Sequence, residues 1–120
     1  MSKYVDVYLL PIPAANIPAY KKVATKAGKL FLKHGALRYR EYAASDLKVE
    51  DCIVPFPSAV PLKDGETLVY AAVEFKSESH RNRAMKSIFN DPALTAIMGD
   101  KPLFDYERMV YGGFKVIVDL

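Results

Sequence analysis

Tryptophan is absent from the sequence, and cysteine occurs once, as Cys52. A single thiol forms no internal disulfide, so nothing here indicates an oxidising compartment. No apolar run approaches the roughly 18 residues needed to cross a membrane. The N-terminal run VDVYLLPIPAA is no signal peptide, because Asp6 and two prolines interrupt it. We therefore expect a cytoplasmic protein without membrane association.

Motifs that hold metals or nucleotides are also missing. The two histidines, His34 and His80, form no zinc-binding spacing with Cys52. The chain contains no HExxH, CxxC or GxSxG motif and no phosphate-binding glycine loop. We expect neither a metal nor another cofactor.

The charge balance gives little sign of a nucleic-acid partner. The formal net charge is only +3, and both signs are interspersed. Four lysines follow one helical stripe: Lys22, Lys26, Lys29 and Lys33. Such a stripe is typical of the solvated face of an amphipathic helix, and no aromatic side chains are interleaved with it. The alternative is a surface for an acidic partner. We expect no nucleic acid to bind.

What the sequence does contain is enough apolar residues for one domain spanning 1–120, with 51% hydrophobic residues. Period-two and period-3.6 patterns predict strands over 4–10, 36–44, 67–76 and 107–118, and helices over 16–34, 78–90 and 92–98. Gly35 should end the first helix with a positive φ. A short strand near 59–62 should pair with 67–76 through the Asp64-Gly65 turn. The order β-α-β-β-α-β predicts a ferredoxin-like α+β fold.

One face of such a sheet is left open, because right-handed crossovers place both long helices on the other face. Simple alternation assigns these residues to the open face: Tyr4, Asp6, Tyr8, Leu10, Leu68, Tyr70, Glu74, Met109, Tyr111 and Ile117. A monomer seldom exposes so apolar a patch, and tyrosine is enriched at interfaces. We therefore expect a homodimer, a dimeric α+β barrel. The alternative is a monomer whose open face water tolerates.

Asp6 is the most informative polar residue, because aspartate is disfavoured in mid-strand. A buried carboxylate must be paired or protonated. Its candidate partners are Arg38, Arg40 and Arg108. Asp6 would then either anchor a ligand or act as a general base, or form a structural ion pair.

Other polar residues complete a candidate ligand site. Tyr8, Tyr70 and Tyr111 would either orient a ligand through their hydroxyls or pack at the interface. Glu41 shares its strand parity with Tyr39, which favours a position against the helices. The candidate ligand-binding set is Asp6, Tyr8, Arg38, Glu41, Tyr70, Arg108 and Tyr111.

Three residues are candidates for catalysis: Asp6, His34 and Arg108. His34 ends the first helix, where a cation favourably meets the helix dipole, so its alternative role is structural. Gly112 and Gly113 would either open the backbone to a ligand or allow a bulge or tight contact in the last strand.

Several segments together resemble the YbaA-like family of uncharacterised bacterial proteins, within the dimeric α+β barrel superfamily. They are YVD at 4–6, HGAL at 34–37, Glu41, YAAVEF at 70–75, DP at 91–92 and RMVYGGF at 108–114. The chain departs from the family's YVDGF and PFDGKRM patterns with YVDVY and LFDYERM, where Tyr106 reshapes the loop. The resemblance implies the fold and a homodimer, and it implies no reaction.

Three functions remain open. The first is a small-molecule binding dimer whose ligand lies in the barrel. The second is a cofactor-independent enzyme, monooxygenase- or isomerase-like by analogy of fold alone. The third is a structural or interaction module with a filled barrel. A cavity with convergent polar groups would favour the first two.

Overall fold

The computed structural model describes residues 2–49 and 53–120, so Cys52 lies outside the described residues. Four antiparallel strands form one sheet in the order β2-β3-β1-β4. The strands are β1 (Tyr4–Pro13), β2 (Arg38–Ala43), β3 (Glu66–Phe75) and β4 (Val110–Lys115). The helices are α1 (Ile17–Lys33), α2 (Phe56–Ala59), α3 (Glu78–Phe89) and α4 (Pro92–Met98), with 3₁₀ turns η1 (Ala14–Asn16) and η2 (Tyr106–Arg108).

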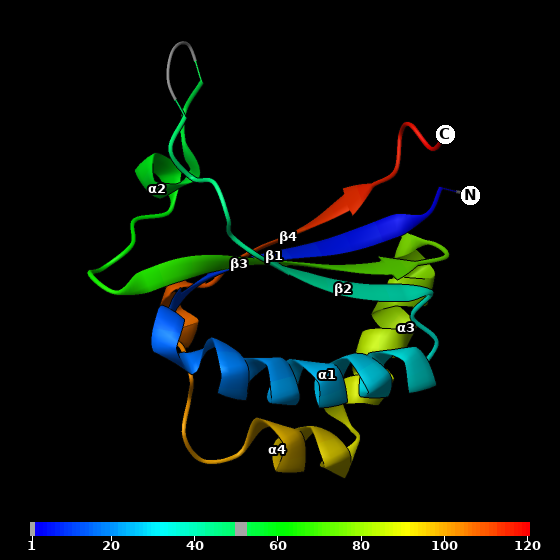
Figure 1. Ribbon diagram of the computed structural model, residues 1–120. Helices are drawn as coiled ribbons and strands as arrows, with labels where there is room; N and C mark the ends of the chain where they lie inside the picture. Colours follow the sequence, from blue (N-terminus) through cyan, green and yellow to red (C-terminus); the bar gives the residue numbers. More distant parts are fainter. Residues whose placement is uncertain (1, 50–52) are drawn as a thin grey trace.

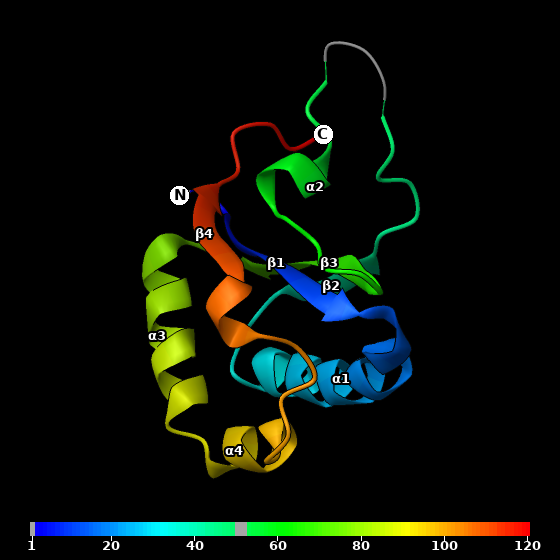
Figure 2. The same cartoon turned by 90° about the vertical axis from the view of Figure 1, so that its left-hand side faces the viewer.

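Figure 1 shows two unequal layers. Both α1 and α3 lie on one side of the sheet, hereafter the helix side. Figure 2 shows α4 at the far end of α3, beneath α1. The short α2 lies on the opposite side, hereafter the open side. The expected ferredoxin-like α+β fold is confirmed. Within the described residues, no helix is long and apolar enough to cross a bilayer.

The prediction of a short strand near 59–62 is wrong. Residues 56–59 form α2 instead, and β3 begins only after the turn at Gly65, whose φ is +79°. The first residues of β3 pair with β1, where Pro13 lies opposite Glu66. Prolines 55, 57 and 61 lack the backbone donors that a ladder needs, which explains the missing strand.

β1 continues through the prolines that were expected to end it. Pro11 lies opposite Leu68 and Pro13 opposite Glu66. β4 pairs with β1 only as far as Leu9, so the last residues of β1 have a neighbour on one side alone. A proline nitrogen is tolerated in a strand where no partner needs its missing proton.

The register of β1 on β3 corrects the expected faces. Tyr4, Asp6, Tyr8 and Leu10 lie opposite Phe75, Val73, Ala71 and Val69. Directly opposed residues share a face, so these side chains lie on the helix side. Tyr111, opposite Tyr8, lies there too. Their expected place on the open face is wrong, because β1 carries apolar residues at both parities. Tyr70 and Glu74 have the parity of the open side, as expected.

The core lies between the sheet and the helices. Its fully buried members include Ile12, Val73, Phe75 and Ile88. Met109 packs against this core and not on the open face, whereas Ile117 lies beyond β4 and is exposed. The helical spacing of Phe89 predicts an inward side chain, but Phe89 is 70% exposed at the end of α3.

The helix ends follow the sequence closely. Gly35 has a φ of +108° after α1, as predicted. The Ser77 hydroxyl accepts a hydrogen bond from the His80 amide, and Asp91 accepts one from the Ala93 amide, so these residues cap α3 and α4. Asn16 precedes α1 but makes no cap, because its side-chain amide donates to the Leu103 carbonyl at 2.8 Å.

Of the two glycines of β4, Gly113 allows a tight contact and Gly112 does not. β4 pairs with β1 without interruption from Tyr4–Lys115 to Leu9–Val110, so the strand has no bulge. A Cβ added to Gly113 would lie 2.2 Å from the Tyr4 hydroxyl and 2.7 Å from its ring. Gly112, which has the open-side parity, has ordinary space around it, with its added Cβ 3.4 Å from Phe114.

Gly113→Ala should therefore destabilise the protein by about 1 to 3 kcal/mol, because the buried Tyr4 ring must move. Gly112→Ala is the matched control and should change the free energy of unfolding by less than about 0.5 kcal/mol. Urea unfolding at one protein concentration measures both. Equal effects of the two substitutions would show that Tyr4 does not press on Gly113.

Candidate functional site

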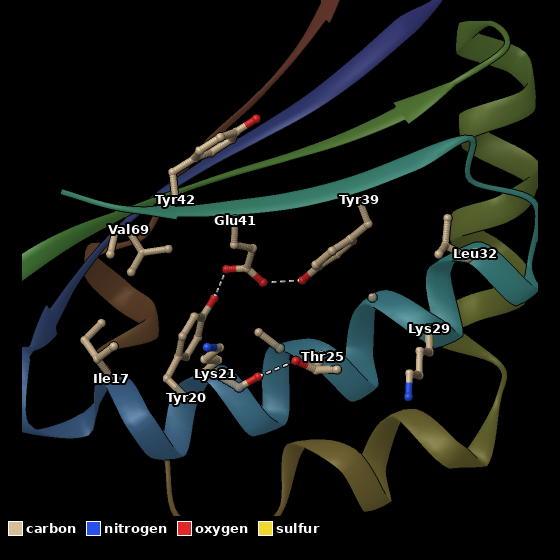
Figure 3. A pocket seen from close by; sticks show the side chains of 13 residues that line it. Ile17, Tyr20, Lys21, Thr25, Lys29, Leu32, Tyr39, Glu41, Tyr42 and Val69 are labelled. Carbon is tan, nitrogen blue, oxygen red and sulfur yellow. Dashed lines mark hydrogen bonds between the residues drawn. The ribbon is translucent and has the colours of Figure 1, made fainter. Parts of the chain in front are cut away.

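Three side chains from α1 and β2 meet on the helix side and form what we call the Glu41 cluster: Tyr20, Tyr39 and Glu41. In Figure 3, Tyr39 and Glu41 point from β2 toward α1, and Tyr20 points back from α1 toward Glu41. The Tyr20 hydroxyl donates to Oε1 of Glu41, and the Tyr39 hydroxyl donates to Oε2. Each carboxylate oxygen thus accepts one short tyrosine hydrogen bond.

The Glu41 cluster stands between two hollows. One is an open groove of about 600 Å³ between α1 and the edge strand β2. The other is a cavity of about 230 Å³ between the sheet and the helices. Four residues line both hollows: Tyr20, Ala24, Tyr39 and Glu41. A molecule in either space therefore meets the same polar wall.

A glycine in α1 allows this wall to form. Gly28 is buried, and a Cβ there would lie 2.7 Å from the Tyr39 ring. The missing side chain lets the ring lie against the helix, and so sets the height of the Tyr39 hydroxyl beside Glu41.

Electrostatics keep the tyrosines of the cluster as neutral donors. Burial raises the pKa of Tyr20 and Tyr39 well above the usual tyrosine range, and the negative charge of Glu41 raises both further. A phenol beside a carboxylate cannot readily ionise, since two anions would share one site. Both hydroxyls therefore stay protonated and hold the carboxylate in place.

Tyr8 brings a third hydroxyl to the hollow from β1. It lines the cavity, and its ring centroid lies 4.9 Å from that of Tyr111. Burial raises the pKa of Tyr8, and the charge of Asp6 adds to that effect. Tyr8, a lining residue of the cavity, therefore also stays neutral.

Asp6 lies in a second group, the Asp6 cluster, with Tyr4, Arg81 and Tyr111. Arg81 donates from Nη1 to Oδ1 of Asp6 at 2.7 Å, and the Tyr111 hydroxyl donates to the same oxygen at 3.0 Å. The Arg81 guanidinium carbon lies 4.7 Å from the centre of the Tyr4 ring. Arg81, from α3, is the partner of Asp6, rather than Arg38, Arg40 or Arg108.

The Asp6 carboxylate is wholly buried, with 0% exposure. Its Oδ2 atom has no hydrogen-bond partner among the described residues. Burial raises the pKa of Asp6, against the opposing effects of Tyr111 and Arg81. Asp6 lines neither the groove nor the cavity. Its geometry is that of an ion pair joining α3 to the centre of the sheet.

Arg108 and His34 occupy separate places away from both hollows. Arg108 makes a two-pronged ion pair with Glu66, at 2.7 and 2.8 Å, and these hydrogen bonds lower the pKa of Glu66 to about 2. His34 lies 2.8 Å from Oδ2 of Asp91, the residue that caps α4. This contact lowers the pKa of Asp91. Each pair ties two elements together.

The remaining candidate residues lie on both sides of the sheet. Arg38 and Tyr70 have the parity of the open side, while Glu41 and Tyr111 lie on the helix side. Of the seven candidate ligand residues, the structure brings Tyr8 and Glu41 to the hollows, and places Asp6 and Tyr111 in the neighbouring cluster. The other three lie elsewhere.

Three residues that matter here were not among the candidates: Tyr20, Tyr39 and Arg81. The sequence did carry a signal for each. Tyr20 belongs to the apolar stripe of α1, and Tyr39 shares the parity of Glu41. Arg81 precedes Ala84 by three residues, which puts a charge on the inward stripe of α3. A basic residue on an apolar stripe indicates a buried acidic partner, because a buried charge must be paired.

A metal centre has no support in residues 2–49 and 53–120. These residues contain no group of three histidine, cysteine, aspartate or glutamate side chains able to hold an ion.

Comparison with known proteins gives the family. Residues 3–106 match the family described as "Protein of unknown function (DUF1428)". The chain belongs to this family. It is also 37% identical over 117 residues to "Uncharacterized protein YbaA" of Escherichia coli strain K12, with 98% of each chain covered, and equally to that of Shigella flexneri. The resemblance to the YbaA-like family is confirmed.

Solved structures resemble this DUF1428 chain in fold. A nipsnap family protein with unknown function from Agrobacterium tumefaciens has a TM-score of 0.63 at 15% identity, over 96% of this chain and 88% of that one. A dimeric ferredoxin-like protein from an uncultured marine organism scores 0.59 at 11% identity, over all of both chains. SnoaB, a cofactor-independent oxygenase from Streptomyces nogalater, scores 0.59 at 14%, over 100% and 98%. These likenesses show the fold alone.

The Asp6–Arg81 pair predicts a strong asymmetry between single and double substitutions. Arg81→Met should destabilise the protein by about 3 to 5 kcal/mol, because it leaves Asp6 buried without a cation. Adding Asp6→Asn should restore part of that loss. Arg83→Met, at an exposed position of α3, is the matched control and should have little effect. Urea unfolding measures all three, and an Arg81→Met loss no larger than the control's would rule out the buried pair.

Proposed function

We propose that this protein binds a small molecule in the hollow between α1 and the sheet, as a homodimeric α+β barrel. One observation carries the proposal: the open groove and the inner cavity meet at the Glu41 cluster. The groove gives access from solvent, the cavity takes an apolar body, and the cluster supplies fixed polar contacts.

The size and lining of the hollows support this proposal. Ligand pockets usually measure about 300 to 1,000 Å³, are mostly apolar and carry a few placed polar groups. The groove, at about 600 Å³, falls in that range, and the cavity of about 230 Å³ adjoins it. The cavity lining includes Val23, Phe31, Ile88 and Met109. Such space argues against a module filled with its own side chains.

Of the residues proposed from sequence, Tyr8 and Glu41 are kept as ligand contacts. Tyr20 and Tyr39 join them. We assign Asp6, His34 and Arg108 to structural pairs, since each is engaged with a partner outside the hollows. The bacterial relatives support a bacterial protein, and the single domain and the cytoplasmic location remain part of the proposal.

A cofactor-independent enzyme working in the same hollow is the second candidate. The observation that favours it is Glu41, a carboxylate at the wall of an apolar cavity, which is a suitable position for a general base. SnoaB, described as a cofactor-independent oxygenase, shares the fold and supplies an analogy only. Catalysis would be identified by a substrate that Glu41→Gln still binds but no longer converts.

Filling the shared wall should abolish binding. Ala24 lines both hollows, so Ala24→Phe should reduce the affinity for phenethyl alcohol, a neutral probe, at least about tenfold. Ala19→Phe, at an exposed position of the same helix that lines neither hollow, should bind the probe as the unsubstituted protein does. Calorimetry and ligand-observed NMR measure both. Equal affinities of the Ala24→Phe and Ala19→Phe proteins for the probe would contradict binding at the shared wall.

The homodimer rests on the open side of the sheet. Apolar residues there remain exposed: Tyr42 is 48%, Tyr70 is 38%, Val110 is 46% and Phe114 is 58% exposed. Beside them, Val7 lies between Ala72 and Gly112, so the side chains at the centre of the open side are small. A patch of this kind is normally covered. The dimeric ferredoxin-like relative in fold supports the same assembly.

A charge at the centre of the open side should separate the copies. Val7→Lys should convert a dimer into a monomer at tens of micromolar protein, because an unpaired ammonium would be buried between two sheets. Leu37→Lys is the control, since Leu37 is 42% exposed and lies in the connection between α1 and β2. Sedimentation velocity measures the mass, and a monomeric unsubstituted protein would rule out the dimer.

A further inference from the structure

Building on the proposed function, we infer that the ligand is an apolar amine. Its ammonium group binds the Glu41 carboxylate, and its apolar body fills the adjoining cavity. The inference follows from the charge of the wall, the aromatic lining and the contrast between Asp6 and Glu41, the two strand carboxylates that face the helices.

Glu41 has hydrogen bonds but no cation. Its two oxygens accept from Tyr20 and Tyr39, and no ion pair joins it to any lysine, arginine or histidine of the described residues. A carboxylate has about four acceptor positions, so about two remain for a ligand. Each tyrosine hydroxyl has one proton and already donates it in a hydrogen bond to Glu41. The group missing from this wall is therefore a donor with positive charge.

Asp6 is a carboxylate whose cation comes from the protein itself, and it therefore contrasts with Glu41. It lies on the same side of the sheet, and Arg81 approaches it to 2.7 Å. α3 therefore supplies the cation that Asp6 requires. Among residues 2–49 and 53–120, no cationic side chain forms an ion pair with Glu41, although it borders a cavity with far more apolar than polar lining residues. One carboxylate is completed within the protein, and the other is left for a bound molecule.

The lining suits an organic cation. Tyr8, Tyr20, Phe31, Tyr39 and Phe104 all line the cavity. The faces of aromatic rings carry partial negative charge and attract ammonium groups, most strongly where water is excluded. The same rings accommodate an aromatic or aliphatic body. Aromatic walls around one carboxylate form a site for an amine with an apolar substituent.

Three lysines border the hollows, and they define the competing ligand class. Lys21 and Lys29 line the groove and Lys101 lines the cavity, and all three residues are exposed. Long lysine side chains contribute their methylene stems to a wall and keep the charge in water. Their charges belong to the rim, while Glu41 lies at the shared inner wall. An anionic ligand bound by the rim lysines is the alternative that the experiment separates.

Three probes with one phenyl body and different heads test the inference. Phenethylamine is cationic at neutral pH, phenethyl alcohol is neutral and hydrocinnamate is anionic. Calorimetry should find phenethylamine binding at least about tenfold more tightly than phenethyl alcohol, with hydrocinnamate weakest. Glu41→Gln removes the charge and keeps an acceptor for one tyrosine. It should bring the amine to within about threefold of the alcohol.

Two controls separate charge from folding. Glu107→Gln removes an exposed carboxylate of η2 that lines neither hollow, and should leave the preference for the amine unchanged. Retained binding of phenethyl alcohol by Glu41→Gln shows that the hollow is intact. Equal affinity for the amine and the alcohol, or a preference for hydrocinnamate, overturns the amine inference and leaves the binding function standing. If none of the probes binds saturably, the proposed function fails as well.

Discussion

Ten consecutive residues of β1 lie opposite ten of β3, and this antiparallel register determines where the polar groups of the protein lie. It turns Asp6 and Tyr8 toward the helices, and through β4 it places Tyr111 beside them. A shift by one residue would exchange every side chain of β1 between the two sides of the sheet. Asp6 would then meet solvent, and Arg81 would lie in the core without an acid.

The overall fold was predictable because it rests on patterns that are local. Helix stripes, caps at Ser77 and Asp91, and the glycine after α1 all act within a few residues of chain. The faces of β1 were not predictable by alternation, since both of its sides carry apolar residues and both sides of the sheet are apolar. The register comes from pairing with β3, a strand far away in the chain: Asp6 lies opposite Val73, which is 67 residues later (73 − 6).

The candidate site was predictable only in part for the same reason. Shared parity with Tyr39, a relation within one strand, favoured the helix side for Glu41 without deciding its face, and the structure places it there. Tyr20 comes from another element, and only the packing of α1 on β2 brings its hydroxyl to Glu41. The partner of Asp6 is 75 residues away, on the helix that follows β3. Pairing across such distances depends on tertiary structure that a single sequence pattern does not contain.

Asp6 and Glu41, the two strand carboxylates that face the helices, differ in what they do for stability. The Asp6–Arg81 pair fixes α3 to the sheet, and it leaves little freedom for that helix to move without exposing a buried charge. The Glu41 cluster joins α1 to β2 through neutral donors alone. These hydrogen bonds are also charge-assisted, because their acceptor is a carboxylate, but they bury no charge on α1.

The groove opens beside the edge strand β2, and the patch proposed for assembly lies on the opposite side of the sheet, with Tyr42 a member of both. Two copies joined through that patch would keep their entrances apart, each at its own edge. Neither hollow would borrow a residue from the other copy. Where joining the copies leaves both hollows unchanged, linkage makes the ligand affinity the same in the separated and the joined chains. Saturation would follow a simple hyperbola, and dilution of the protein would leave its midpoint unchanged.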